Sequence, residues 1–304
     1  MHTPVAGFCS RLAARGLRAG GLQVVYTAHG FHFHPQGNAV SNGIYRFLER
    51  IAGRWTDELV VINRHDEREA LAHQIVPADR ITFTPGIGID TLEWSAERVD
   101  AGAVQAVASE LRIAAGTPLG LMVAEFNPGK RHADALRAFA AMRARNAHLL
   151  FAGTGPQWKA MQELSASLGV GERVHFLGMR RDIPVLMAAA AFLVLPSERE
   201  GLPRSILEAM ALGRCVIGTD IRGIRDLLEP DRGVLVPLGD WQALAAAMDG
   251  VLADPVHTQR LGRHARAAAV DCYDTRRILE QHAVLYDRCL RRRGFGTMRR
   301  SAAL

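Results

Sequence analysis

Two carboxylates eight positions apart, Glu200 and Glu208, lie in the run PSEREGLPRSILEAMALG, with Gly201 and Pro203 between them. The preceding apolar run predicts a strand, and Pro203 suits the first turn of a helix, where its missing N–H costs nothing. Glu200 is therefore expected in the loop at the carboxyl end of a strand, and Glu208 in the second helical turn. Doubly wound sheets bind ligands at such strand ends, and Gly201 and the helix start suit close approach by an anion. The alternative for either carboxylate alone is a solvated surface charge.

The elements that must position this site are predicted by apolar runs that alternate with helical patterns. Up to residue 95, three runs predict strands: LQVVYTA, ELVVIN and RITFTPG. After residue 100, six runs do so: LGLMVAEF, HLLFAG, RVHFLG, AFLVLPS, CVIGTD and GVLVP. Helical patterns between the strands indicate an α/β protein whose parallel sheets are covered by helices on both faces. A doubly wound domain normally needs five or six strands, so the first domain is expected to be incomplete.

The run PSEREGLPRSILEAMALG resembles the E-x7-E signature of the family 4 retaining glycosyltransferases, which have the GT-B fold of two facing Rossmann-like doubly wound domains. The resemblance extends from about residue 2 to residue 290 and is strongest to bacterial enzymes that build capsule, exopolysaccharide or lipid-linked oligosaccharide. It implies that Glu200 contacts hydroxyls of the donor sugar, and that Glu208 holds the ribose hydroxyls of the nucleotide. Ionised carboxylates suit both tasks because they accept hydrogen bonds from vicinal diols. The backbone of Gly201 and Leu202 is then expected near the sugar or the phosphates.

Two further segments match the family's catalytic positions. VAEFNPGKRH (123–132) resembles the loop that supplies an Arg and a Lys to the diphosphate. Lys130 matches that Lys and is one of only two lysines in the chain, whereas Glu125 stands at the usual Arg position, as in relatives that read GEL. The strand VVYTA ends at His29, which matches a family His that reaches the donor sugar near the reacting carbon. The resemblance therefore implies His29, Lys130 and Glu200 as catalytic residues; a solvated loop lysine is the alternative for Lys130.

Two glycine-containing strand ends support a nucleotide site. FAGTGP (151–156) makes Gly153 and Gly155 candidates beside the nucleotide. FLGMRRD (176–182) resembles the loop whose backbone contacts the base, with Gly178, Met179 and Arg180 as the matching residues. The alternative for this second segment is an Arg-rich surface turn before a helix.

No metal site and no cofactor are expected, since the nucleotide-sugar is a substrate. His32 and His34 alternate with phenylalanines, but no carboxylate or Cys completes a ligand set, so structural roles are predicted for both. The four cysteines are widely scattered without a CxxC pair, which favours a reduced cytosolic protein without disulfides.

The resemblance also organises the chain into parts. We expect a partial N-terminal Rossmann-like, acceptor-side domain over residues 1–95 and a nucleotide-sugar-binding Rossmann-like domain over 96–275. Residues 276–304 are expected to form a helix that packs back toward the first domain and ends in a basic tail. Roughly 80 residues of the family pattern are missing before Met1, including a Gly-rich loop, so either Met1 is an internal start or the chain is degenerate. We favour an internal start.

The expected reaction is transfer of a sugar, with UDP as the favoured carrier, to a hydroxyl of a growing polysaccharide or a lipid-linked saccharide. The resemblance implies a metal-independent reaction with retention and without an enzymic nucleophile. Lys130 and the helix start before Ile206 would stabilise the departing diphosphate. The alternatives are a nucleotide-binding remnant without transferase activity and a GT-B sugar-nucleotide epimerase.

Composition bears on partners and location. The net charge is +6, and basic runs such as Arg291-Arg292-Arg293 suit an anionic membrane surface. No nucleic-acid-binding motif accompanies the charge, so nucleic acid is not expected as a partner. Apolar runs stay far below the roughly 20 residues of a membrane span, and the start of the sequence resembles no secretory signal. We expect a cytoplasmic protein with peripheral contact at the inner face of the cell membrane.

Overall fold

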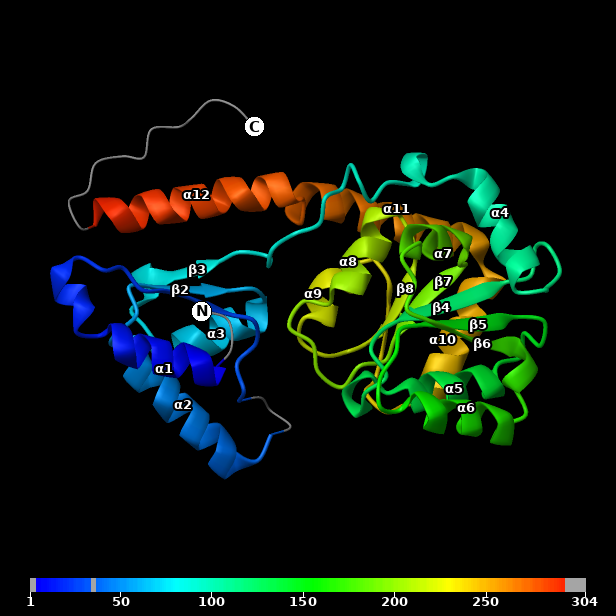
Figure 1. Cartoon of the computed structure of the whole chain (residues 1–304), viewed down its shortest axis with the longest axis horizontal. Helices are drawn as coiled ribbons and strands as arrows, with labels where there is room; N and C mark the ends of the chain where they lie inside the picture. The colour runs from blue at the N-terminus through cyan, green and yellow to red at the C-terminus, as the bar shows by residue number, and fades with distance from the viewer. Residues whose placement is uncertain (1–3, 34–36, 293–304) are drawn as a thin grey trace. The chain divides into compact units, whose positions relative to one another are not determined.

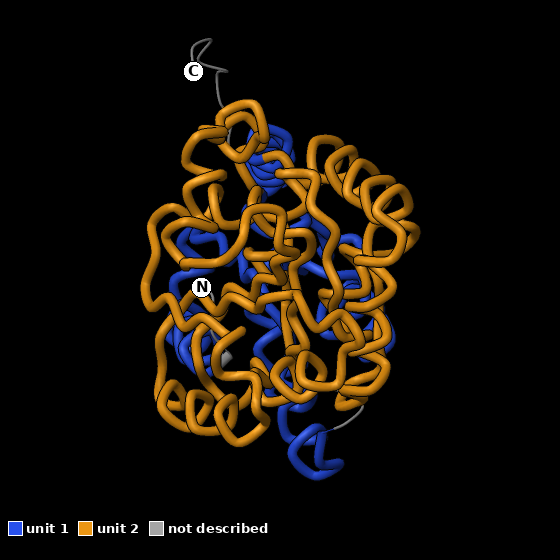
Figure 2. The backbone as a smooth tube through the Cα atoms, turned by 90° about the vertical axis from the view of Figure 1, so that its right-hand side faces the viewer, with its two compact units in different colours: residues 1–88, 275–304 blue, residues 89–274 orange. Residues whose placement is uncertain are grey.

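The computed structural model describes residues 4–33 and 37–292, so His34 and Arg293 lie outside the described residues. The chain divides into two compact units, residues 1–88 with 275–304, and residues 89–274 (Figure 2). Each unit contains one wholly parallel sheet, with the strand order β1-β2-β3 in the first and β6-β5-β4-β7-β8-β9 in the second (Figure 1). The predicted α/β class, with three strands in the first sheet and six in the second, is confirmed.

Every predicted apolar run contains a strand. The strands are β1 (Val25–Ala28), β2 (Glu58–Val61), β3 (Ile81–Phe83), β4 (Leu119–Val123), β5 (His148–Ala152), β6 (Val174–Gly178), β7 (Phe192–Leu195), β8 (Val216–Thr219) and β9 (Val234–Val236). The helices are α1 (Pro4–Ala14), α2 (Ala39–Gly53), α3 (Arg64–Ala72), α4 (Ala101–Glu110), α5 (His132–Ala141), α6 (Trp158–Ser167), α7 (Ile183–Ala189), α8 (Arg204–Ala211), α9 (Ile224–Leu228), α10 (Trp241–Ala253), α11 (Pro255–Cys272) and α12 (Thr275–Arg291).

The central strand of the first unit's sheet is buried on both faces. All four residues of β2 are buried, and because side chains alternate along a strand, Leu59 and Val61 point to one side and Val60 to the other. Leu59 and Val61 join a cluster with Phe31. Val60 packs instead against α12, and the buried carboxylate of Glu58 pairs with Arg288 of this helix and with Arg292, which directly follows it. The C-terminal helix is therefore part of the first unit.

The second unit is a doubly wound domain. Helices α5, α6 and α10 cover one face of its sheet, with α10 packed on α5, while α7, α8 and α11 cover the other (Figure 1). The strands are nearly continuous apolar runs because both faces are covered, and Leu121, Leu150 and Ile217 are completely buried. A single large core fills this unit.

The boundary between the units lies at Gly88/Ile89 rather than after residue 95. Residues 89–95 pack on the end of α11 and the residues that follow it. The N–H of Ile89 donates to the carbonyl of Tyr273 at 2.8 Å, and the Arg266 guanidinium donates to the carbonyls of Thr91 and Trp94. These long-range hydrogen bonds explain why the glycine pair of PGIGIDTLEW marks the break but the rest of that run belongs to the second unit.

Within the described residues, no helix combines the length and the apolar character needed to cross a membrane.

Candidate active site

The candidate site of the second unit lies at the carboxyl edge of its sheet. Strand order runs outward from β4 to β5 and β6 on one side, and to β7, β8 and β9 on the other. The chain therefore reverses direction across the sheet between β4 and β7, where the loops that follow diverge to opposite faces. This is the switch point at which open α/β sheets form a ligand crevice. The loops after β4 and β7 carry Lys130 and Glu200.

Lys130 and Glu200 meet directly across this switch point. The Lys130 ammonium group donates a hydrogen bond of 2.6 Å to a carboxylate oxygen of Glu200. Their side chains are 26% and 10% exposed, so both charges are partly withdrawn from water. The two loops are also joined by their backbones, since the N–H of Glu198 donates to the carbonyl of Gly129 at 2.8 Å. The structure thus brings two of the predicted residues together, 70 positions apart in sequence.

Glu208 lies in the second turn of α8, as predicted, and is largely buried. Burial raises the pKa of its carboxyl group, while the neighbouring Arg204 opposes this rise. The Nε of Arg204 donates to one Glu208 oxygen at 2.9 Å, one helical turn away. Pro203 is the N-cap of α8 rather than a residue of its first turn, and no side chain caps this helix start. Its first N–H groups can therefore meet an acceptor.

Gly153 and Gly155 hold the loop after β5 close to the loop after β4. Both adopt positive φ angles, 144° and 156°, which favour glycine. A Cβ atom on Gly153 would lie 2.0 Å from the carbonyl oxygen of Ala124, and one on Gly155 would lie 2.6 Å from that of Phe126. Their visible role is close backbone packing, which fixes the path of the Lys130 loop.

The loop after β6 carries the remaining predicted nucleotide contacts. Gly178 ends the strand, and Met179 is 78% exposed. Arg180 is held by carboxylates, with hydrogen bonds to Asp182 at 2.6 and 2.8 Å and to Glu110 of α4, and these hydrogen bonds raise its pKa. The carbonyl of Gly178 accepts from the N–H of Gly153 at 2.8 Å, and the Arg180 side chain has anionic partners.

The two histidines described after β1 differ in their surroundings. His29 directly follows the carboxyl end of β1, as predicted, and is exposed. Phe31 and Phe33 stack on each other at 4.8 Å in the core of the first unit. His32 lies edge-on to Tyr45, with ring centroids 5.3 Å apart, in keeping with the structural role predicted for it.

Sequence reasoning missed two residues that follow Lys130. Arg131 adopts a left-handed conformation, and its guanidinium pairs with Asp134 at 2.6 Å and approaches Glu198 at 3.8 Å. His132 begins α5 and is 1% exposed, with its ring stacked on Phe126 at 4.1 Å. Neither ring nitrogen has a hydrogen-bond partner among the described residues. Burial, with a smaller effect of the Lys130 charge, lowers the His132 pKa to about 4, so this ring is neutral. Adjacency to Lys130 was the only signal for either residue.

Comparisons with known proteins agree with this architecture. Residues 105–268 match the family model of the group 1 glycosyl transferases, and residues 1–87 match a glycosyl transferase 4-like domain. EpsD of Bacillus subtilis (strain 168), which is named as a glycosyltransferase, is 32% identical over 289 residues, covering 94% of this chain and 74% of EpsD. UDP-Gal:alpha-D-GlcNAc-diphosphoundecaprenol alpha-1,3-galactosyltransferase of Escherichia coli is 28% identical over 261 residues, covering 84% of this chain and 66% of the relative.

Solved structures share the fold. Anabaena HepE in complex with UDP superposes with a TM-score of 0.82 at 22% identity, over 93% of this chain and 76% of HepE. Sucrose-phosphate synthase of Thermosynechococcus elongatus gives a TM-score of 0.79 at 24% identity, over 94% of this chain and 72% of the synthase. At these identities the likeness concerns the fold.

Proposed function

Because the chain belongs to the group 1 glycosyltransferases, we propose that it transfers a sugar from a UDP-sugar to a hydroxyl of a polysaccharide or a lipid-linked saccharide, with retained anomeric configuration. The observation that carries this proposal is the 2.6 Å contact between Lys130 and Glu200 at the switch point of the second sheet. A cation for a diphosphate and a carboxylate for sugar hydroxyls stand side by side there.

Each residue has a task in the proposed reaction. Lys130 and the uncapped start of α8 stabilise the negative charge that grows on the departing diphosphate. Glu200 holds hydroxyls of the donor sugar, and His29 remains a proposed catalytic residue, as the family resemblance implies. Arg204 is the only described hydrogen-bond partner of the Glu208 carboxylate, which leaves the second oxygen for the ribose. The residues act by binding and electrostatics, so no nucleophile or metal enters the proposed mechanism.

The donor and acceptor classes rest on relatives. HepE has been solved with UDP and with UDP-glucose, and the name of the Escherichia coli relative gives UDP-Gal as donor and a diphosphoundecaprenol-linked sugar as acceptor. The UDP-sugars in both names support a UDP-sugar donor for this chain. The acceptor in the name of the Escherichia coli relative supports a lipid-linked acceptor.

A transfer assay tests the proposal. UDP-glucose, UDP-galactose and UDP-N-acetylglucosamine are each offered with GlcNAc-diphosphoundecaprenol, and product is followed by mass spectrometry and its anomeric configuration by NMR. We expect Glu200→Ala and Lys130→Ala each to lower turnover at least about tenfold, or about 1.4 kcal/mol. Lys159→Ala is the matched control, since Lys159 is 87% exposed on α6.

Three outcomes would overturn the proposal. UDP binding without transfer to any acceptor would favour a nucleotide-binding remnant. Conversion of a UDP-sugar without acceptor would favour an epimerase. Normal turnover of both folded variants would remove Lys130 and Glu200 from the site.

We also propose that α2 brings the protein to an anionic membrane that holds the lipid-linked acceptor. Val40, Ile44 and Phe47 follow each other at helical spacing and are 71%, 54% and 64% exposed. The opposite side of the helix buries Asn42 and Glu49, so this helix presents its apolar stripe to the outside. Such a stripe suits the boundary between lipid headgroups and acyl chains.

Charge favours a lipid surface as the occupant of this stripe. Arg50 on α2 and Arg54, which caps the carboxyl end of the helix, are exposed and can meet anionic headgroups. We expect cosedimentation with phosphatidylglycerol–phosphatidylcholine vesicles, and at least about tenfold weaker partitioning of Ile44→Ser/Phe47→Ser, because each apolar side chain contributes about 1.5–3 kcal/mol on burial. The control is Val256→Ser, which removes an apolar side chain that is 78% exposed on the second unit. Equal partitioning of both variants would refute this role of α2.

A further inference from the structure

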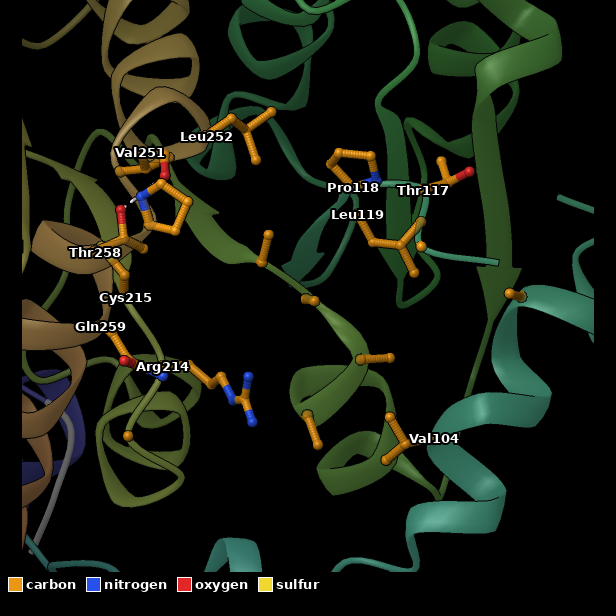
Figure 3. Close-up of a pocket in the computed structure, with 18 of the residues that line it drawn as sticks. Val104, Thr117, Pro118, Leu119, Arg214, Cys215, Val251, Leu252, Thr258 and Gln259 are labelled. Carbon is orange, nitrogen blue, oxygen red and sulfur yellow. Dashed lines mark hydrogen bonds between the residues drawn. The ribbon is translucent and has the colours of Figure 1, made fainter. Parts of the chain in front are cut away.

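A cavity of about 600 Å³ lies at the amino-terminal edge of the second sheet, opposite the edge that carries Lys130 and Glu200. Its walls are residues 117–119 at the start of β4, 188–191 before β7 and 213–215 before β8, with parts of α4, α10 and α11 (Figure 3). All these segments belong to the second unit. The volume is that of an ordinary small-molecule site, about 300–1,000 Å³.

Among the described residues, Arg214 is the only charged side chain that lines this cavity. Most of the other lining residues are apolar, and alanines 188–191 form one wall. In Figure 3 the Arg214 guanidinium extends away from its own backbone into the space between Gln259 and Val104.

The Arg214 charge has no counterpart in the described part of the chain. Its Nε is fully buried without a hydrogen-bond partner, and among the described residues no charged neighbour acts on its pKa. Burial lowers the Arg214 pKa and raises that of the neighbouring Cys215 thiol to about 12, so the thiol is neutral and gives no compensating charge. Arg214 is half-buried, and only its Nε is among the fully buried atoms without a partner, so the terminal nitrogens of the guanidinium are the atoms that an oxyanion in the cavity can meet.

We propose that this cavity binds an amphiphilic monoanion, with its oxyanion on Arg214 and its hydrocarbon body against the alanine wall. The guanidinium fork matches a carboxylate or phosphate in a bidentate geometry. The apolar walls select a ligand whose remainder is hydrocarbon rather than sugar or nucleotide. The site is distinct from the donor site and does not depend on the proposed transfer reaction.

Two dyes of nearly equal shape test the proposal on the full chain. 8-Anilinonaphthalene-1-sulfonate carries one anionic group, whereas N-phenyl-1-naphthylamine has the same rings without charge. We expect saturable fluorescence with the sulfonate dye, at least about tenfold weaker binding in Arg214→Met, and less than about twofold change for the neutral dye. Ala108→Leu, which fills the α4 side of the cavity, should weaken both dyes while leaving Arg214 in place. Excess UDP should displace neither.

The outcomes separate the proposal from general dye binding. Equal loss of both dyes in Arg214→Met, unchanged sulfonate binding in that variant, or displacement by UDP would each overturn it. Thermal unfolding of both variants shows whether they are folded. Decanoate and decyl phosphate, added as competitors, then tell a fatty-acid carboxylate from a lipid phosphate; failure of both to displace the sulfonate dye would also overturn the proposal.

Discussion

Replacement of Lys130 by Gln should weaken UDP binding by roughly 10- to 100-fold. In the structure, the Lys130 ammonium group is 2.6 Å from a Glu200 oxygen and 26% exposed, so it is positioned by a partner and poorly screened by water. A hydrogen bond to a charged group contributes about 1.5–3 kcal/mol, and loss of one such bond to the diphosphate gives this range of affinity. Titration calorimetry with UDP measures it, with Lys159→Gln as the control on the only other lysine.

For Glu200, the partner of Lys130 in this ion pair, we expect the opposite effect on UDP affinity. Unit charges about 4 Å apart attract by about 4 kcal/mol at an effective dielectric constant near 20, and desolvation offsets much of this. Glu200→Gln removes the carboxylate that competes with the diphosphate for Lys130, so UDP should bind at least as tightly as to the native chain. The double variant Lys130→Gln/Glu200→Gln should bind UDP with the same affinity as Lys130→Gln alone, because Glu200 affects UDP binding only through Lys130. UDP affinity within twofold of native in folded Lys130→Gln would refute the assignment, as would equal losses in the two single variants.

Three further predictions concern stability. His132→Phe should flatten the pH dependence of the free energy of unfolding. The pKa of His132 is about 4 in the folded state and 6.5 in the unfolded state, so the native chain is fully stable above pH 6.5 and loses up to about 3 kcal/mol toward pH 4. Urea unfolding at several pH values measures this difference. Gly155→Ala should cost at least about 1–3 kcal/mol because of its φ of 156°, whereas Gly250→Ala, in α10 with open space around it, should be neutral or stabilising; equal midpoints of thermal unfolding would contradict this. Arg11→Met should destabilise by about 3–5 kcal/mol by leaving Glu49 buried without its 2.9 Å partner, and Arg11→Met/Glu49→Leu should recover much of that loss in denaturant titrations.

The fold was readable from local patterns. All nine apolar runs contain strands, because a parallel sheet covered on both faces requires nearly continuous apolar residues. The domain boundary was less accurate, since residues 89–95 are held by hydrogen bonds to Tyr273 and Arg266, which are distant in sequence. Hydrogen-bond partners so distant in sequence cannot be predicted from local periodicity.

The sequence predicted on which strand end or helix each candidate site residue lies, but not which side chains contact one another. The strand–loop–helix order placed Glu200 and Glu208 correctly, because proline and apolar runs fix where a strand ends and a helix begins. Nothing in the sequence indicated that Arg180 is occupied by Glu110, or that His132 is buried without a partner among the described residues.

By itself, the sequence determined the order of strands and helices and the residue types at each strand end, since these depend on neighbours along the chain. Tertiary structure alone decided which strand ends meet. Placing β4 beside β7 brings Lys130 to Glu200 across 70 positions, and it also leaves Arg214 facing a cavity at the other edge of the same sheet. Both results depend on strand pairing, which is set by long-range packing rather than by any local run of residues.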